Sequence, residues 1–211
     1  MARVVPPAQT VLGGAGNRFP RRGRIHVGGV RVPAGFNFTG HMEALIRHAC
    51  ACVPELAHVQ MDAVAVTYRQ TRKAVSYGLQ ACLTPLRFEN GALQGELRGR
   101  RWSMPRMIGP DGQDLLYLLS FYLPRYLNRP FHDKLVTIFH ELWHISPAFD
   151  GDLRRHEGRC YMHSPRQADF DAQAESLVQT WLATEPPSEL YAFLHQDFRK
   201  LLSSHGGLRG V

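Results

Sequence analysis

Long apolar runs are missing from this chain of 211 residues. It has no stretch of about eighteen consecutive apolar residues, the minimum expected for a membrane-spanning helix. Its first residues, MARVVPPAQTVLGGAGNRFPRRGR, also lack the apolar segment of a secretory signal. These absences argue against a membrane protein and against an exported one, so we expect a cytoplasmic protein with no membrane partner.

Cysteine is also scarce, and the spacing of the four cysteines matches no disulfide or zinc pattern. Cys50, Cys52, Cys82 and Cys160 show neither a disulfide framework nor a zinc-ribbon pattern. One residue separates Cys50 from Cys52, whereas structural zinc sites usually separate their cysteines by roughly two to four residues. We therefore expect reduced and mostly buried thiols.

Acidic residues are fewer than basic residues in this chain. Lysine and arginine total 25 against 18 aspartate and glutamate residues, which gives a formal net charge of +7. Much of the excess lies in two groups, Arg18, Arg21, Arg22, Arg24 and Arg31, then Arg98, Arg100, Arg101 and Arg106. Such an excess permits attraction to nucleic acid without demonstrating it, so nucleic acid stays a candidate partner of the basic surface.

The composition predicts one domain with an extension at each end. Hydrophobic residues make up 44% of the chain, which suffices for a single core. Residues 1–38 are rich in Gly, Pro and Arg and are predicted to form a basic arm. Residues 39–204 carry periodic apolar patterns and are predicted to form the domain, and residues 205–211 a C-terminal tail.

Apolar periodicity predicts the elements of this domain. Helices are expected from Thr39 to before Pro54, from about Pro165 to Pro186, and over PSELYAFLHQDFRKLLSS. The segments MDAVAVTYRQ and AVSYGLQACLTPLRFENGAL are expected to supply antiparallel strands, and RRWSMPRMIGPDGQD a long loop. The apolar stretch DLLYLLSFYLPRYLNR fits either a strand or a helix, and we favour a strand for its first part. The edge of such a sheet offers a groove where an extended peptide can bind by strand addition.

The segment FHDKLVTIFHELWHISPAFDGD carries the strongest chemical signal, the motif HExxH. Residues four apart on a helix share one face, so His140 and His144 can direct their imidazoles at one metal ion. Glu141 is then placed to take a proton from a metal-bound water, which is the role of the glutamate at this position of the motif in metalloproteases. The motif predicts a zinc site with Glu141 as general base.

The residues around the motif predict a buried helix. Pro130 suits a helix start, and Leu135, Ile138, Phe139 and Leu142 give the helix an apolar side. Two histidines and a glutamate in so apolar a helix are costly to bury without a partner, and a metal supplies one.

A catalytic zinc site normally has three protein ligands, and the sequence offers four candidates for the third. Asp150 follows His144 by six residues, a metzincin-like spacing, although Pro147 stands where that motif has glycine. His156 and His163 lie in the polar segment after the helix, and Glu175 lies on the next predicted helix. The spacing alone leaves these alternatives open.

The segment HELWHISPAFDGDLRRHEGRCYMHS, preceded by YLPRYLNRPFHDKLVTIF, resembles a family of small uncharacterised bacterial and archaeal metallopeptidase-like proteins. The resemblance spans roughly residues 60–180 and implies that His140, Glu141 and His144 carry the family's roles, with His163 as the third ligand. More distantly, the order of helix, short sheet and HExxH helix is similar to SprT-like proteases, which cleave proteins associated with DNA, although the zinc ribbon that many of those carry is missing here.

These observations predict an α+β fold, a minimal zincin-like domain whose small, mostly antiparallel sheet packs on helices that include the HExxH helix. The expected function is a zinc-dependent metallopeptidase that hydrolyses peptide bonds of a peptide or protein substrate through a metal-activated water. The alternative is a zinc-stabilised, non-catalytic module that binds nucleic acid or protein.

Overall fold

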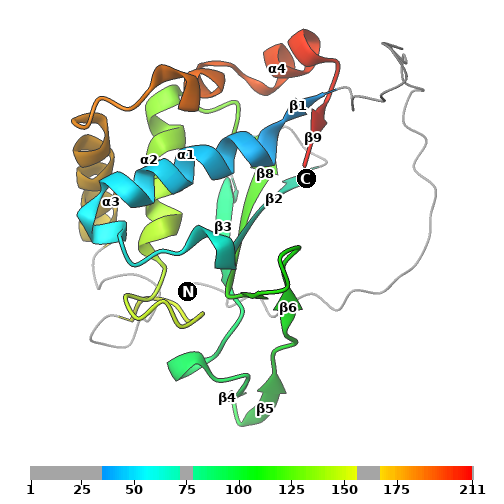
Figure 1. Ribbon diagram of the computed structural model, residues 1–211, viewed down its shortest axis with the longest axis vertical. Helices are drawn as coiled ribbons and strands as arrows, with labels where there is room; N and C mark the ends of the chain where they lie inside the picture. The colour runs from blue at the N-terminus through cyan, green and yellow to red at the C-terminus, as the bar shows by residue number, and fades with distance from the viewer. Residues whose placement is uncertain (1–34, 72–77, 156–166, 211) are drawn as a thin grey trace, which may run out of the picture. The chain divides into compact units, whose positions relative to one another are not determined.

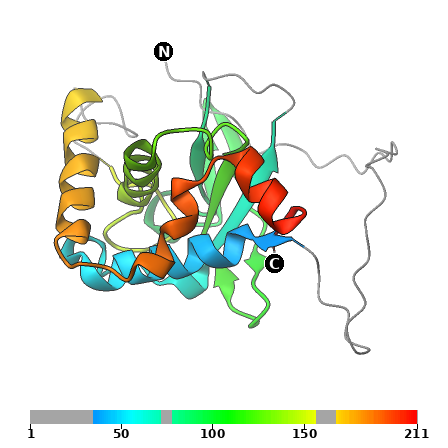
Figure 2. The same cartoon turned by 90° about the horizontal axis from the view of Figure 1, so that it is seen from above.

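The computed structural model describes residues 35–71, 78–155 and 167–210, which form the α+β fold expected from the sequence. Helix α2 lies between α3 and a three-stranded sheet (Figures 1 and 2). The helices and strands are β1 (Phe36–Asn37), α1 (Phe38–Cys52), β2 (Val64–Gln70), β3 (Ala81–Pro85), β4 (Gln94–Leu97), β5 (Arg100–Ser103), β6 (Met107–Ile108), β7 (Asp114–Leu115), β8 (Tyr117–Leu123), α2 (Phe131–Trp143), α3 (Gln167–Leu182), α4 (Phe198–His205) and β9 (Leu208–Arg209), with short 3₁₀ helices at Pro54–Leu56, Met61–Ala63, Glu89–Gly91, Ser188–Leu190 and Ala192–His195.

The three-stranded sheet has the order β2-β8-β3. Strand β8 runs antiparallel to β3, as predicted, with Leu83 opposite Leu119. It runs parallel to β2, with Val64 opposite Tyr117, so the expectation of antiparallel pairing is wrong for this pair. The difference arises because β3 and two further strand pairs lie between β2 and β8 in the chain, which lets β8 re-enter the sheet from the same end as β2.

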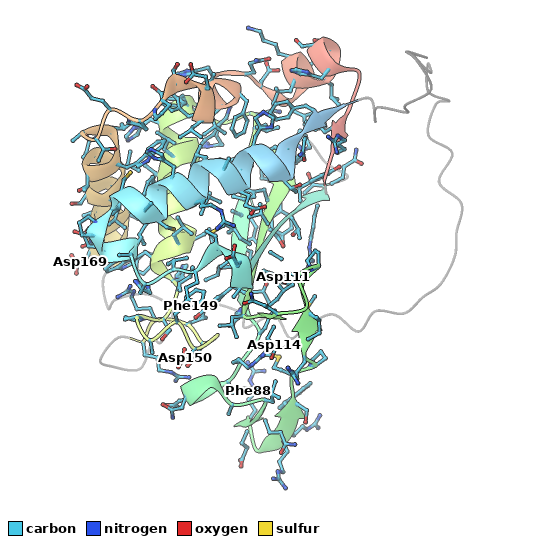
Figure 3. The ribbon with its side chains drawn as sticks, viewed as in Figure 1. Phe88, Asp111, Asp114, Phe149, Asp150 and Asp169 are labelled. Atoms are coloured by element: carbon cyan, nitrogen blue, oxygen red, sulfur yellow. The ribbon has the colours of Figure 1, made fainter. Side chains whose placement is uncertain are left out.

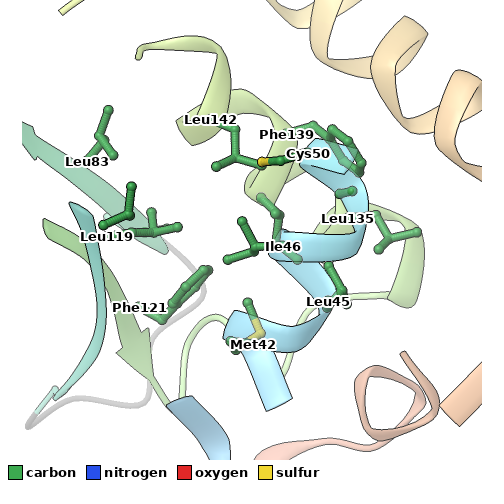
Figure 4. Packing of buried hydrophobic residues seen from close by; sticks show 14 of the residues in the cluster. Met42, Leu45, Ile46, Cys50, Leu83, Leu119, Phe121, Leu135, Phe139 and Leu142 are labelled. Atoms are coloured by element: carbon green, nitrogen blue, oxygen red, sulfur yellow. The ribbon is translucent and has the colours of Figure 1, made fainter. Parts of the chain in front are cut away.

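The core lies where α1 and α2 meet the sheet (Figure 4). The predicted apolar side of α2 is confirmed, because all four of its residues are fully buried, namely Leu135, Ile138, Phe139 and Leu142. From α1, Met42, Leu45 and Ile46 pack into the same cluster. This packing fixes α2 from one side and leaves its opposite side for the HExxH residues.

The predicted C-terminal helix is interrupted, which corrects the expectation of one continuous helix. Two 3₁₀ helices precede α4, and the chain between them and α4 is held by Lys134. The buried Lys134 ammonium donates to the carbonyl oxygens of Leu194 at 2.7 Å and Gln196 at 2.8 Å. Asp197 then starts α4 afresh, because its side chain accepts a hydrogen bond from the backbone N–H of Lys200.

Two segments expected to be irregular contain strands. Strand β9 pairs in parallel with β1, so part of the predicted C-terminal tail joins the residues just before α1. The predicted long loop contains β5 and β6, which correct that expectation. Arg98 and Gly99 have φ of 53° and 70°, the left-handed conformation that a two-residue hairpin turn requires, and this turn joins β4 to β5. In the described ranges, no helix is long and apolar enough to span a bilayer.

The buried Lys134 amine predicts a pH-dependent stability. Burial lowers its pKa from 10.5 to about 8. Between these values the unfolded chain retains a proton that the folded chain releases, so we expect this group to raise the free energy of unfolding as the pH increases from about 8 to 10.5. Urea unfolding followed by circular dichroism across this window measures the slope.

The matched comparison is between two lysine variants. Lys134→Met should lack this rise with pH, whereas Lys200→Met, which removes an exposed amine, should keep it. Equal slopes in wild-type protein and in Lys134→Met would contradict the assignment.

Candidate metal centre

Helix α2 brings the two histidines of the motif together. The ring centroids of His140 and His144 lie 5.0 Å apart, as expected for residues one turn apart on a helix. The His144 residue is 9% exposed, and the His140 side chain is 20% exposed. Both imidazoles therefore lie at the edge of the core, where burial is favourable only if their polar atoms have partners.

The first turns of α3 contact both histidines. The Phe170 ring stacks on His144 and meets His140 at an angle, with both centroid distances at 4.7 Å. Next to it, a carboxylate oxygen of Asp171 lies 3.7 Å from Nδ1 of His140. Such a carboxylate can orient a metal-binding histidine through one ring nitrogen and leave the other for the metal.

Asp171 is a site residue that the sequence analysis missed. Its only sequence signal is that it lies one helical turn before Glu175, which was considered as a ligand. The structure places Glu175 elsewhere, because its carboxylate meets Nε2 of His132 at 2.8 Å. His132 precedes His140 by eight residues, which corresponds to about 12 Å along a helix.

Glu141 points its carboxylate at the edge of the sheet. The backbone N–H of Leu83 in β3 donates to Oε2 of Glu141 at 2.8 Å. Burial raises the pKa of Glu141 to about 7, and the hydrogen bond from Leu83 opposes that rise by stabilising the charged form. A nearby cation would lower this pKa, because it also favours the charged carboxylate.

Strand β3 is the edge strand of the sheet at this point, and α2 packs against it. The antiparallel register with β8 alternates inward and outward backbone groups, and the Leu83 N–H points outward, as its bond to Glu141 shows. Ala81 and Pro85 share this outward orientation, and Pro85 has no N–H to leave unpaired. Within the described residues, no strand pairs with this edge.

The loop after α2 is braced by its own side chains. Asp150 Oδ1 accepts from the backbone N–H of Asp152 at 3.2 Å, and Asp152 Oδ2 accepts from Arg155 Nε at 2.8 Å. The Tyr117 hydroxyl donates to the Asp152 carbonyl and accepts from the Gly151 N–H. Figure 3 shows Asp150 in this loop. The contacts assign Asp150 and Asp152 to holding the turn, one of the roles that their positions allow.

The braced loop returns the chain to the end of α2. The Arg154 N–H donates to the His144 carbonyl at 2.7 Å, and the Arg154 guanidinium lies 3.7 Å from the centre of the Trp143 ring. Arg154 and Phe170, which precede and follow residues 156–166 in the sequence, therefore both contact His144.

Of the four candidates for the third ligand, Asp150 and Glu175 lie in the described part of the chain. His163 and its alternative His156 lie outside the described residues, and both stay predictions. Among the residues that the structure does describe, no three His, Cys, Asp or Glu side chains converge as a metal-holding group. The imidazoles of His140 and His144 are nonetheless donors that suit Zn²⁺. The residues present fit a zinc site that needs at least one further ligand.

Comparison with protein families, with curated proteins and with solved structures finds no match for this chain. The chemistry of the site therefore rests on its residues and their geometry.

Zinc affinity tests the roles of these side chains. His140→Ala and His144→Ala are expected to abolish stoichiometric zinc binding, since each removes a ligand. Asp171→Asn is expected to weaken binding by about 10- to 100-fold, the usual effect of losing a carboxylate that orients a ligand histidine. Competition with a chromogenic chelator measures these affinities.

Two carboxylates on α3 serve as controls. Asp169→Asn removes an exposed carboxylate from the start of the helix, and Glu175→Gln removes the partner of His132. Neither should change the affinity. If Glu175→Gln lowered the zinc affinity as much as Asp171→Asn, the specific role of Asp171 beside His140 would be contradicted.

Proposed function

We propose that this protein is a zinc-dependent metallopeptidase with a zincin-like site, in which His140 and His144 bind Zn²⁺ and Glu141 is the general base. The observation that carries the proposal is the position of the Glu141 carboxylate. Glu141 follows the first histidine of the motif in the sequence, and its carboxylate accepts a hydrogen bond from Leu83 in the edge strand β3. The base and a surface that can hold an extended peptide therefore adjoin each other.

The protein's own groups perform the proton transfers. A bound zinc ion would polarise the scissile carbonyl and lower the pKa of the attacking water. Glu141 accepts the proton of that water and returns it to the leaving amine. Burial raises the pKa of Glu141 and a bound zinc ion would lower it, and a carboxyl under these opposing influences can both accept and release a proton. The Leu83 N–H keeps one carboxylate oxygen fixed during this exchange.

The substrate in this proposal is an extended peptide or an unfolded segment of a protein. Such a chain can pair with the outward backbone groups of β3, a mode of recognition that uses backbone hydrogen bonds and tolerates varied side chains. The Leu83 N–H stays bonded to Glu141, so in this proposal the peptide pairs with the other outward backbone groups of β3, such as those of Ala81, and this would bring a peptide bond close to the base.

His163 is the third ligand in this proposal, ahead of His156. The proposal is supported by the contacts of His144 with Arg154 and Phe170, because His163 lies between these two residues in the sequence.

A second candidate is a zinc-stabilised module without turnover that binds nucleic acid or protein. The bond between Leu83 and Glu141 also favours it, since a carboxylate that ties a helix to a strand has a structural use. The two candidates differ in whether Glu141 is needed for hydrolysis or for stability.

Hydrolysis by the zinc-loaded wild type separates these candidates, and the variant Glu141→Gln tests the general base. Glutamine keeps an oxygen acceptor for the Leu83 N–H but cannot take a proton, so zinc binding and melting temperature should persist while hydrolysis falls by about 100- to 10,000-fold. Cleavage of a fluorescently labelled unfolded protein by the zinc-loaded chain measures the rate, with exposed Glu189→Gln as the control at wild-type activity. Wild-type hydrolysis in Glu141→Gln would exclude the general-base role, and a zinc-loaded wild type without hydrolysis would favour the binding module.

A further inference from the structure

The β4–β5 hairpin is an exposed ribbon that the peptidase proposal does not use. It extends away from the helices (Figure 1), and in the described part of the chain it pairs with no third strand. All four residues of β5 are exposed, and Trp102 is 39% exposed. Two-stranded hairpins are marginally stable in water, so a large aromatic residue left exposed on one is a feature to explain.

One face of this hairpin is aromatic. Trp102 lies directly opposite Gly95, so their Cα–Cβ directions point to the same face. A Cβ at Gly95 would come within 2.5 Å of the Phe88 ring, which shows that Phe88 occupies that face as well. Arg100 lies two residues before Trp102 and so projects from the same face. We call the surface formed by Phe88, Arg100 and Trp102 the Trp102 face.

The arginines of the hairpin lack acidic partners on this face. Arg98 in the turn and Arg100 make no ion pair within the described residues. The glutamate of the hairpin, Glu96, lies opposite Arg101 on the other face. By contrast, Arg106 in the neighbouring segment forms an ion pair with Asp114 at 2.7 Å, a carboxylate that it shares with Arg87. The positive charge that is left available therefore borders the Trp102 face.

We propose that the Trp102 face binds single-stranded nucleic acid. A guanidinium group donates in a planar fork that matches a phosphate, and an exposed indole offers a surface on which an unpaired base can stack. An unpaired strand fits better than a duplex, because the bases of a duplex are already stacked on each other. The formal charge of +7 adds a favourable long-range attraction to such a polyanion.

The surface fits an anionic membrane less well. Glu96 lies on the hairpin and would approach the negative surface together with the arginines. Binding to nucleic acid needs contact only along one face of the ribbon, which leaves Glu96 in water on the other.

Fluorescence anisotropy of a labelled oligodeoxythymidylate of about 16 nucleotides, titrated with the full-length chain, tests the proposal. Trp102→Ala is expected to weaken binding by about 5- to 150-fold, the cost of losing one stacked base, and Trp102→Phe should retain most of it. Because Trp102 is exposed on the hairpin, the melting temperature of both variants should match the wild type.

Arginine variants test the phosphate contacts. Arg98→Asn keeps a residue that tolerates the left-handed turn, and Arg100→Gln keeps a long polar side chain. Each should reduce the dependence of log K on log salt by about 0.7 for one lost phosphate contact. The control Arg199→Gln removes an exposed arginine from α4 and should leave both affinity and salt dependence unchanged.

The following outcomes would overturn the proposal. One is the absence of oligonucleotide binding, and another is binding that survives in Trp102→Ala and Arg100→Gln, which would assign it to another basic surface. Equal affinity for the matching duplex would exclude base stacking. Stronger binding to phosphatidylserine vesicles than to the oligonucleotide would assign the face to a membrane surface. None of these results depends on peptidase activity.

Discussion

The hydrogen bond from the Leu83 N–H to Glu141 is the contact on which the arrangement of the site depends. It joins the edge strand of the sheet to the helix that carries both histidines. Without it, the edge would present an unsatisfied donor, and a buried carboxylate would have lost a partner that stabilises its charge. The contact therefore sets the separation between the helix and the strand edge, and with it the space in which chemistry can occur.

Local patterns predicted the parts of the fold that depend on local spacing. The buried residues of α2 and the first helix follow from periodicity, because each buries one face against the same core. The central strand β8 is buried along most of its length, so its apolar run only slightly favoured a strand over a helix. The HExxH geometry follows for the same reason, since His140 and His144 are one turn apart on any helix. The predictions were right where the neighbours in sequence are also the neighbours in space.

Contacts between distant segments were not predictable in this way. Asp171 reaches His140 only because α3 packs beside α2, and nothing near Asp171 in the sequence marks it. Parallel pairing of β2 with β8 depends on the path of the chain between them. Lys134 interrupts a segment that has helical periodicity. Its ammonium donates hydrogen bonds to the carbonyl oxygens of Leu194 and Gln196, which would accept backbone N–H groups in a continuous helix. In each case a single long-range polar or backbone contact decides the outcome.

The parallel pairing of β1 with β9 has a topological consequence. Phe36 and Leu208 are direct neighbours, so the first and last strands of the described domain adjoin each other. A short peptide linker could join these ends and a new start could be opened in an exposed turn, which makes the fold a candidate for circular permutation. By the same geometry, the domain could be inserted into a surface loop of a host protein without separating the two sides of that loop.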